Sequence, residues 1–316
     1  MTRRYHRWPR STVAAGRPVP GGHTGAVLEP RLQSPPVPPA STVVTRRAAV
    51  LGMPIEHSLS PVLHTAAYAA LGLSGWHYGK HAVDEDGLPG FVAALGPEWV
   101  GLSLTMPLKR VALDVATEVT PDTAAVGAAN TLVRRGTGWL AANTDVAGIE
   151  QALRAVGVTS VDRAVIVGAG GTAQAALAAL CRLGESTPTV LVRDPARAGA
   201  LRDTAERLGV APRIVGGFPG TPLPAADVVI STVPAGAADA LTDAAWDPAT
   251  VLLDVIYAPW PTAPAVAATA SGCRVAGGLE VLLHQAVVQV ELMTGLPGPT
   301  EAMAAALTKA AGDRRP

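Results

Sequence analysis

The sequence AVIVGAGGTA at residues 164–173 decides how this chain of 316 residues folds. Its first four residues are apolar and predict a buried strand, and Gly168, Gly170 and Ala173 follow in the spacing G-x-G-x-x-G/A. In that spacing the first glycine allows a tight turn, the second lets a pyrophosphate approach the backbone, and the small third residue lets a helix pack on the strand. The helix N-terminus near Gly171 then offers free N–H groups to a phosphate. We therefore expect a dinucleotide site rather than a plain strand–helix turn.

Short apolar runs alternate with amphipathic stretches on both sides of this turn, which indicates an α/β fold. Downstream, we predict a helix ending at Leu183, strands at 190–192, 228–231 and 251–255, and helices at 281–293 and 300–311. Upstream, we predict strands at 48–51, 76–82 and 99–104, a hairpin of 130–134 and 139–142, and helices at 61–71, 86–95 and 146–156. The chain should therefore hold an N-terminal α/β domain with a mainly parallel sheet, followed by a Rossmann-type, doubly wound cofactor domain.

The composition excludes several classes of protein. Apolar residues make up 48 % and charged residues 16 %, which excludes a fully disordered chain and a coiled coil. No stretch approaches the roughly 18 apolar residues of a membrane span, and 25 basic residues balance 25 acidic ones, so neither a membrane nor a nucleic-acid partner is expected. Cys181 and Cys273 lack metal-ligand spacing, which predicts free thiols, no metal site and a reducing, cytoplasmic location.

The N-terminal segment differs in charge from the rest of the chain. Residues 1–47 hold eight arginines and one acidic residue, so this segment carries +7 and the remainder −7. Residues 1–40 also hold eight prolines and no periodic apolar face. We therefore expect residues 1–45 to form a disordered, basic, proline-rich extension, without the apolar core of a secretory signal. A tail that touches acidic partners is the alternative.

A lysine and an aspartate are the candidates for acid–base chemistry. The chain has 22 arginines but only three lysines, and Lys109 stands where the predicted strand 99–104 runs into a helix begun by Pro107. Asp145 follows the strand 139–142 and either caps the next helix or faces Lys109 across a cleft. A Lys–Asp pair suits alcohol oxidation or ketone reduction, because one group moves the proton while a hydride moves to or from a nicotinamide. A surface lysine is the alternative for Lys109.

The cofactor preference depends on residues 192–197, at the end of the second strand of the dinucleotide-binding unit. Arg193 and Arg197 suit the 2′-phosphate of NADP. Asp194 suits the free 2′-hydroxyl of NAD, but Asp194 and Pro195 also form a good helix start that needs no ligand. We expect NADP, with NAD as the alternative.

Seven segments together resemble the shikimate dehydrogenase family, and they occur in the family's order over about residues 46–296. They are LGMPIEHSLSPVLH (51–64), GLSLTMPLK (101–109), GAANTL (127–132), NTDVAG (143–148), GAGGTA (168–173), DVIYAP (254–259) and GLEVLLHQA (278–286). Departures from the family's pattern at Val192, Asp194 and Val281 affect the expected cofactor preference and not the chemistry.

The resemblance implies reversible, NADPH-dependent reduction of 3-dehydroshikimate to shikimate, on the route to chorismate and the aromatic amino acids. It implies a catalytic pair of Lys109 and Asp145, and no catalytic role for His57, His64 or His284. It assigns the substrate's carboxylate to Ser58 and Ser60, with Ser60 also expected as the N-cap of helix 61–71. The further substrate contacts that it implies are Thr105, Asn130, Tyr257 and Gln285. The cofactor contacts that it implies are Gly168, Gly170, Gly171, Ala173, Arg193, Arg197, Thr232 and Gly278.

The same resemblance implies a domain division and leaves two alternatives open. Residues 46–148, completed by helices within 280–312, would bind the substrate, and residues 149–279 would bind NADP. The assembly would be a monomer or a homodimer. The alternatives are a quinate/shikimate or aminoshikimate dehydrogenase that uses NAD, and a non-catalytic metabolite-binding relative.

Overall fold

The structure is a computed structural model that describes residues 45–312, so residues 1–44 of the predicted extension lie outside the described residues. One six-stranded sheet holds β1 (Arg46–Gly52), β2 (Trp76–Ala82), β3 (Trp99–Leu104), β4 (Glu118–Val119), β5 (Thr131–Arg135) and β6 (Gly138–Ala142). A second six-stranded sheet holds β7 (Ala164–Val167), β8 (Thr189–Leu191), β9 (Arg213–Val215), β10 (Val228–Ser231), β11 (Val251–Asp254) and β12 (Arg274–Ala276).

The α-helices are α1 (Ser60–Ala70), α2 (Gly87–Ala93), α3 (Pro121–Val126), α4 (Asp145–Ala155), α5 (Gly171–Arg182), α6 (Gly199–Leu208), α7 (Ala263–Ala270), α8 (Gly278–Thr294) and α9 (Thr300–Gly312). Short 3-10 helices are η1 (Val111–Leu113), η2 (Pro195–Ala198) and η3 (Asp239–Asp243). Over residues 45–312, no helix combines the length and the apolar character needed to cross a bilayer. The predicted boundary between residues 148 and 149 falls inside α4, and the domain division stays a prediction.

The second sheet is fully parallel, with the strand order β12-β11-β10-β7-β8-β9. The order reverses between β7 and β10, as in a doubly wound fold, and ligands of such folds bind where the order reverses, beyond the carboxyl ends of the strands. The glycine turn at residues 168–173 directly follows β7 and therefore lies at this point. The predicted Rossmann-type domain is confirmed.

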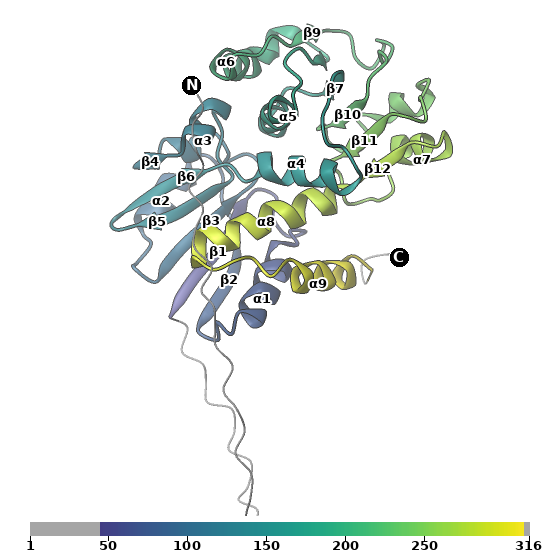
Figure 1. Cartoon of the computed structure of the whole chain (residues 1–316). Helices are drawn as coiled ribbons and strands as arrows, with labels where there is room; N and C mark the ends of the chain where they lie inside the picture. The colour runs from purple at the N-terminus through teal and green to yellow at the C-terminus, as the bar shows by residue number, and fades with distance from the viewer. Residues whose placement is uncertain (1–44, 313–316) are drawn as a thin grey trace, which may run out of the picture. The chain divides into compact units, whose positions relative to one another are not determined.

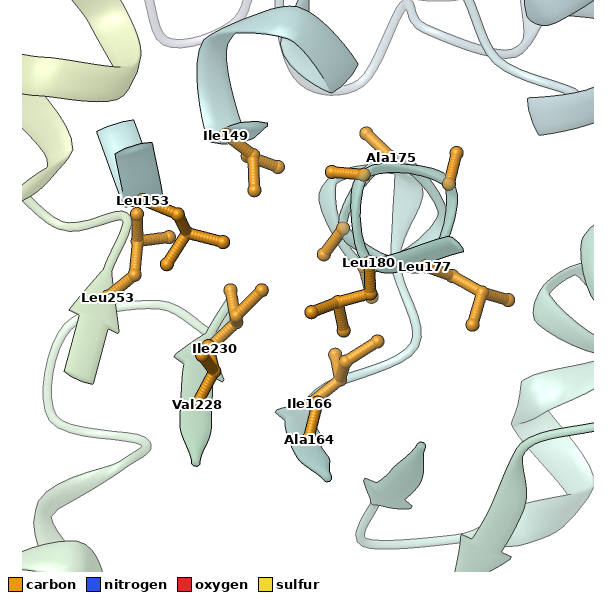
Figure 2. Close-up of a cluster of buried hydrophobic side chains, with 14 of the residues drawn as sticks. Ile149, Leu153, Ala164, Ile166, Ala175, Leu177, Leu180, Val228, Ile230 and Leu253 are labelled. Atoms are coloured by element: carbon orange, nitrogen blue, oxygen red, sulfur yellow. The ribbon is translucent and has the colours of Figure 1, made fainter. Parts of the chain in front are cut away.

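Both faces of the second sheet are covered by apolar side chains. In Figure 2, Leu153 of α4 and Leu180 of α5 lie against Ile166 of β7 and Ile230 of β10. Neighbouring strand residues such as Val229 point to the opposite face, where they pack in a separate core with α7. Burial on both faces explains why these strands read as continuous apolar runs rather than as alternating patterns.

The first sheet is mixed, with the order β2-β1-β3-β5-β6-β4. Strand β1 is parallel to β2 and β3, whereas β5 is antiparallel to β3 and to β6 because the hairpin at Gly136 reverses the chain. Helix α2 contributes Leu88 and Val92 to the core on one face of this sheet. Helix α8 lies against β3 and β5, and it packs with α1 and α9 (Figure 1).

Helix α4 links the two sheets because it covers the second sheet and also packs against α8 (Figure 1). The two helices approach closely at Gly148. A Cβ atom built at this glycine would lie 2.9 Å from the Val281 carbonyl oxygen and 2.9 Å from the Gln285 Cβ atom. This close approach brings Gln285 of α8 beside the first turn of α4.

We predict that Gly148→Ala destabilises the protein by about 1–3 kcal/mol, because the added methyl group overpacks the contact between α4 and α8. The matched control is Gly90→Ala at an exposed position of α2, where a Cβ atom meets nothing within 4 Å. That change should be neutral or slightly stabilising, because alanine favours a helix over glycine by about 1 kcal/mol. Urea unfolding measures both changes, and equal losses in the two variants would contradict the packing described here.

Candidate active site

One cavity of about 310 Å³ is bordered by β1 and β3 of the first sheet, by Val255 directly after β11 of the second sheet, and by α5 and α8. Its walls include every residue predicted for catalysis or substrate binding, together with one of the predicted cofactor residues. These are Ser58, Ser60, Thr105, Lys109, Asn130, Asp145, Tyr257, Gln285 and Gly278. Residues that the sequence analysis did not single out also line it, among them Ser103, Thr172 and Gln289. The last of these lies one helical turn after Gln285, a spacing that could have indicated it.

Lys109 and Asp145 form an ion pair at this cavity. The Lys109 Nζ atom donates to Asp145 Oδ2 over 2.6 Å, and the two side chains are only 19 % and 11 % exposed. Lys109 lies in a turn between β3 and η1, so no α-helix begins at Pro107, contrary to the prediction. Asp145 is the first residue of α4 and does not cap it, because the N-cap position is held by Thr144. Its carboxylate is directed to the lysine instead.

Asn130 holds the other oxygen of this carboxylate. The Asn130 Nδ2 group donates to Asp145 Oδ1 over 2.8 Å and to Thr144 Oγ1 over 2.9 Å. The Asn130 Oδ1 atom accepts from the Thr144 backbone N–H over 2.8 Å and from Thr131 Oγ1 over 2.9 Å. With its amide bonded on both sides and buried, Asn130 has one defined orientation. Asp145 is therefore held between a lysine and a fixed amide.

The loop before α1 brings Ser58 and Ser60 to the cavity. Ser60 is the first residue of α1, and the prediction that it caps the helix is wrong because the N-cap position belongs to Leu59. The Ser60 backbone N–H donates to Ser58 Oγ over 3.3 Å. The loop is tied to β2 because Lys80 Nζ donates to the Glu56 carbonyl oxygen over 2.5 Å. Ser58 thus lies on a loop with defined contacts, and Ser60 lies where that loop enters α1.

Helix α8 brings Gln285 and, at its first residue, Gly278 to the cavity. Gln285 Nε2 donates to the Leu282 carbonyl oxygen over 2.8 Å, and its Oε1 accepts from Asn130 Nδ2 over 3.3 Å. A Cβ atom at Gly278 would lie 2.1 Å from the Val255 carbonyl oxygen, so only glycine permits α8 to begin against the loop that carries Tyr257. This steric constraint accounts for glycine at position 278 without any contact to a cofactor.

The same loop is anchored by a buried carboxylate. Asp254 accepts from the Ile256 backbone N–H over 3.1 Å and from Thr262 Oγ1 over 2.8 Å. Burial raises the pKa of Asp254, while these hydrogen bonds oppose that shift. Asp254 therefore fixes the backbone just before Tyr257.

The glycine turn borders the cavity through Thr172. Gly168 has φ +111°, and a Cβ atom there would lie 2.6 Å from Thr232 Oγ1. The Thr232 hydroxyl itself donates to the Val167 carbonyl oxygen over 2.8 Å, at the end of β7. A Cβ atom at Gly170 would meet nothing within 4 Å, and α5 begins at Gly171 with no side-chain cap. This open, uncapped helix start fits a pyrophosphate.

Arg193 and Arg197 lie beyond the cavity, after β8, which pairs with β7 and ends on the same edge of the sheet. Both side chains are exposed, and neither makes an ion pair or a side-chain hydrogen bond with any described residue. Asp194 Oδ1 accepts from the Ala196 backbone N–H over 2.9 Å and caps η2. Asp194 therefore has a structural role as a helix cap, which needs no ligand. The two guanidinium groups fit a 2′-phosphate.

Other titratable clusters are few in the part of the chain that the structure describes. Within residues 45–312, no group of three or more His, Cys, Asp and Glu side chains could hold a metal ion. Cys181 and Cys273 are free thiols. His64 is fully buried under the cavity, where its ring stacks on Tyr78 with centroids 3.9 Å apart and its Nε2 donates to Gln289 Oε1 over 3.2 Å. It is a core histidine, and burial lowers its pKa to about 3.

This burial predicts a pH dependence of stability. The unfolded chain takes up the His64 proton near pH 6.5, whereas the folded protein takes it up only near pH 3. The stability due to neutral His64 is therefore complete above pH 6.5 and is lost as the pH falls toward 3. Between about pH 6 and 4.5, the free energy of unfolding of the wild type should fall by about 1.4 kcal/mol per pH unit more than that of His64→Phe. Urea unfolding at several pH values measures this difference. If the free energies of unfolding of the wild type and of His64→Phe change in parallel with pH, His64 does not titrate this way.

Comparison with known proteins agrees with this geometry. The family model of the shikimate dehydrogenase substrate binding domain matches residues 50–132, and that of the shikimate 5′-dehydrogenase C-terminal domain matches residues 278–308. A shikimate dehydrogenase (NADP(+)) of Anaeromyxobacter dehalogenans strain 2CP-1 is 35 % identical over 293 residues, which cover 86 % of this chain and 100 % of that protein.

Solved structures give the same result. Shikimate dehydrogenase of Mycobacterium tuberculosis is 46 % identical with a TM-score of 0.76, over 84 % of this chain and 99 % of that one. Shikimate 5-dehydrogenase of Thermus thermophilus, solved in complex with NADP(H) and shikimate, is 30 % identical with a TM-score of 0.72, over the same 84 % and 99 %. Because these matches extend over nearly the whole length of each relative, this chain belongs to the shikimate dehydrogenase family.

Proposed function

We propose that this protein catalyses the reversible, NADP-dependent reduction of 3-dehydroshikimate to shikimate. The observation that carries the proposal is a single cavity in which hydroxyl and amide side chains surround the Lys109–Asp145 pair beside an open glycine turn. Family membership supports the same activity. We also propose that residues 46–148 with helices in 280–312 bind the substrate, and that residues 149–279 bind NADP.

Different polar side chains of the cavity bind different groups of the substrate. The substrate carries a carboxylate and ring hydroxyls, and Ser58 and Ser60 provide hydroxyl donors for the carboxylate from the loop before α1. Further ring contacts come from the other predicted substrate residues, Thr105, Asn130, Tyr257 and Gln285. Holding the carboxylate at one end orients the reacting oxygen toward the lysine, and such positioning is a large part of the rate enhancement of an enzyme.

Lys109 moves the proton of the reaction. A protonated lysine has three N–H donors, and Asp145 accepts one of them, so two remain for the substrate oxygen. NADPH, when bound, supplies the hydride to the carbonyl carbon. Lys109 gives its proton to the oxygen on which negative charge develops, and it takes the proton back in the oxidation of shikimate. Asp145, held by Asn130, keeps the ammonium group directed into the cavity.

The cofactor would be held by the edge of the second sheet. Gly168, Gly170, Gly171 and Ala173 form the turn that admits the pyrophosphate to the start of α5. Arg193 and Arg197 would pair with the 2′-phosphate. Thr232, whose hydroxyl lies beside Gly168, and Gly278, which lines the cavity, would also contact the cofactor.

We also propose a cytoplasmic location and a monomeric or homodimeric state. Two free thiols support a reducing compartment. Light scattering on the purified full chain decides between one copy and two.

Initial rates with shikimate and with quinate, each with NADP and with NAD, test the proposed activity. We expect the highest kcat/KM for shikimate with NADP. A higher value for quinate with NAD would favour a quinate/shikimate dehydrogenase, and no turnover with any pair would favour a non-catalytic relative.

The role of Lys109 predicts the kinetics of its variants. Lys109→Ala should lower kcat by about 10²–10⁴, the range for a lost proton-transfer group, and should change the KM for shikimate far less. Lys109→Arg should fail nearly as badly, because arginine keeps its proton. A near-normal kcat in the arginine variant would leave this side chain only an electrostatic role.

The assignment of the 2′-phosphate predicts a selective loss. Replacing both Arg193 and Arg197 by alanine should weaken NADP binding by about 1.5–3 kcal/mol per charged hydrogen bond and should leave NAD binding unchanged. The matched control is Arg135→Ala, an exposed arginine in the hairpin of the first sheet, which should leave both cofactors unaffected. Isothermal titration with NADP and NAD measures the effect, and equal losses for the two cofactors would contradict the assignment.

A companion variant tests Asp194. If this aspartate only caps η2, Asp194→Ser keeps both stability and cofactor preference, because serine caps comparably well. A sharp shift of preference from NAD toward NADP would instead show that Asp194 binds the ribose.

A further inference from the structure

A buried glutamine that the proposed mechanism does not use lies at the floor of the cavity. Gln289 of α8 is 1 % exposed, and all of its hydrogen-bonding capacity goes to other buried groups. Its Oε1 accepts from Ser103 Oγ over 2.7 Å and from His64 Nε2 over 3.2 Å. Its Nε2 donates to Thr131 Oγ1 over 3.0 Å and to the Asn130 carbonyl oxygen over 3.3 Å. One amide thus joins α8 to α1, β3 and β5.

On one side, these hydrogen bonds continue to the acid–base pair. Thr131 Oγ1, which accepts from Gln289, donates to Asn130 Oδ1 over 2.9 Å. The Asn130 Nδ2 group in turn donates to Asp145 Oδ1 over 2.8 Å. The orientation of the Asn130 amide is therefore set by Thr131, which Gln289 holds, together with the backbone N–H of Thr144. A rotated Asn130 would present an oxygen to the Asp145 carboxylate and repel it.

On the other side, the hydrogen bonds continue to β2. Tyr78 of β2 donates its hydroxyl proton to Ser103 Oγ over 2.6 Å, and Ser103 donates to Gln289. Tyr78 is buried and does not line the cavity, so it acts on the cavity through Ser103.

We propose that Gln289 is a positioning residue for the proposed reaction: it holds Thr131 and thereby helps to fix the Asn130 amide that holds Asp145. The floor of the cavity is thereby set by one continuous set of buried hydrogen bonds. Such a set has a single arrangement in which every donor meets an acceptor, so it holds the polar groups of the cavity in place before the substrate arrives. This inference rests on the proposed function.

The first test separates positioning from simple stabilisation. Gln289→Met keeps the length of the side chain and removes its hydrogen bonds, and its matched control is Gln174→Met in α5. Gln174 is also 1 % exposed, and its Nε2 bonds Val126, Ala200 and Thr204 outside the cavity. We expect both variants to lower the melting temperature. Only Gln289→Met should also lower kcat for shikimate, by about 10- to 100-fold, because Asn130 and Asp145 lose their alignment. Equal kcat in the two variants overturns the role of Gln289.

A structural readout separates this inference from the proposed function. Crystal structures of Gln289→Met and Gln174→Met report the contact between Asn130 Nδ2 and Asp145 Oδ1, which is 2.8 Å in the wild type. We expect the contact to be lost only in Gln289→Met, even if shikimate proves not to be the substrate. A contact that is kept in Gln289→Met refutes positioning, even if the wild type oxidises shikimate rapidly.

Discussion

The ion pair between Lys109 and Asp145 is the interaction on which the arrangement of the cavity depends. Removing two charges from water costs several kcal/mol unless their remaining hydrogen-bonding groups are satisfied. Asp145 meets this condition because Lys109 occupies one carboxylate oxygen and Asn130 the other. The end of β3, the start of β5 and the start of α4 must therefore converge at one point. The polar side chains around that point are arranged to keep the pair in place.

Helix α4 connects this pair to the cofactor sheet. It begins with Asp145 at the cavity, packs against α8 at Gly148, and then covers the second sheet with Ile149 and Leu153 (Figure 2). A single rigid element thus fixes the acid–base pair relative to the sheet whose edge carries the glycine turn. The proposed reaction needs this arrangement, because proton transfer and hydride transfer must meet at one carbon–oxygen bond. The same helix explains why Gly148 allows no larger side chain.

Much of this fold is predictable from the sequence, because the strands of the second sheet are buried on both faces and read as apolar runs such as 164–167 and 228–231. The motifs likewise indicate the residues that meet at the cavity. The predicted cap role of Ser60 is wrong, because α1 begins at Ser60 itself and its N-cap position belongs to Leu59. Asp145 takes the second of its two predicted roles and pairs with Lys109. Short elements such as β4 and α7 lack a periodic pattern, and Gln289 lies in a mainly apolar helix, where only its spacing of one turn from Gln285 indicates it.

The central claim is that the substrate's carboxylate lies at the serine loop while its reacting oxygen lies at the Lys109–Asp145 pair. A crystal structure of the protein with shikimate and NADPH, which cannot react with each other, tests it most directly. We predict the shikimate carboxylate within hydrogen-bond distance of Ser58 and Ser60, and the oxygen to be oxidised within hydrogen-bond distance of Lys109 Nζ, next to the nicotinamide. Shikimate bound in the opposite direction, or with that oxygen out of reach of Lys109, would contradict the claim.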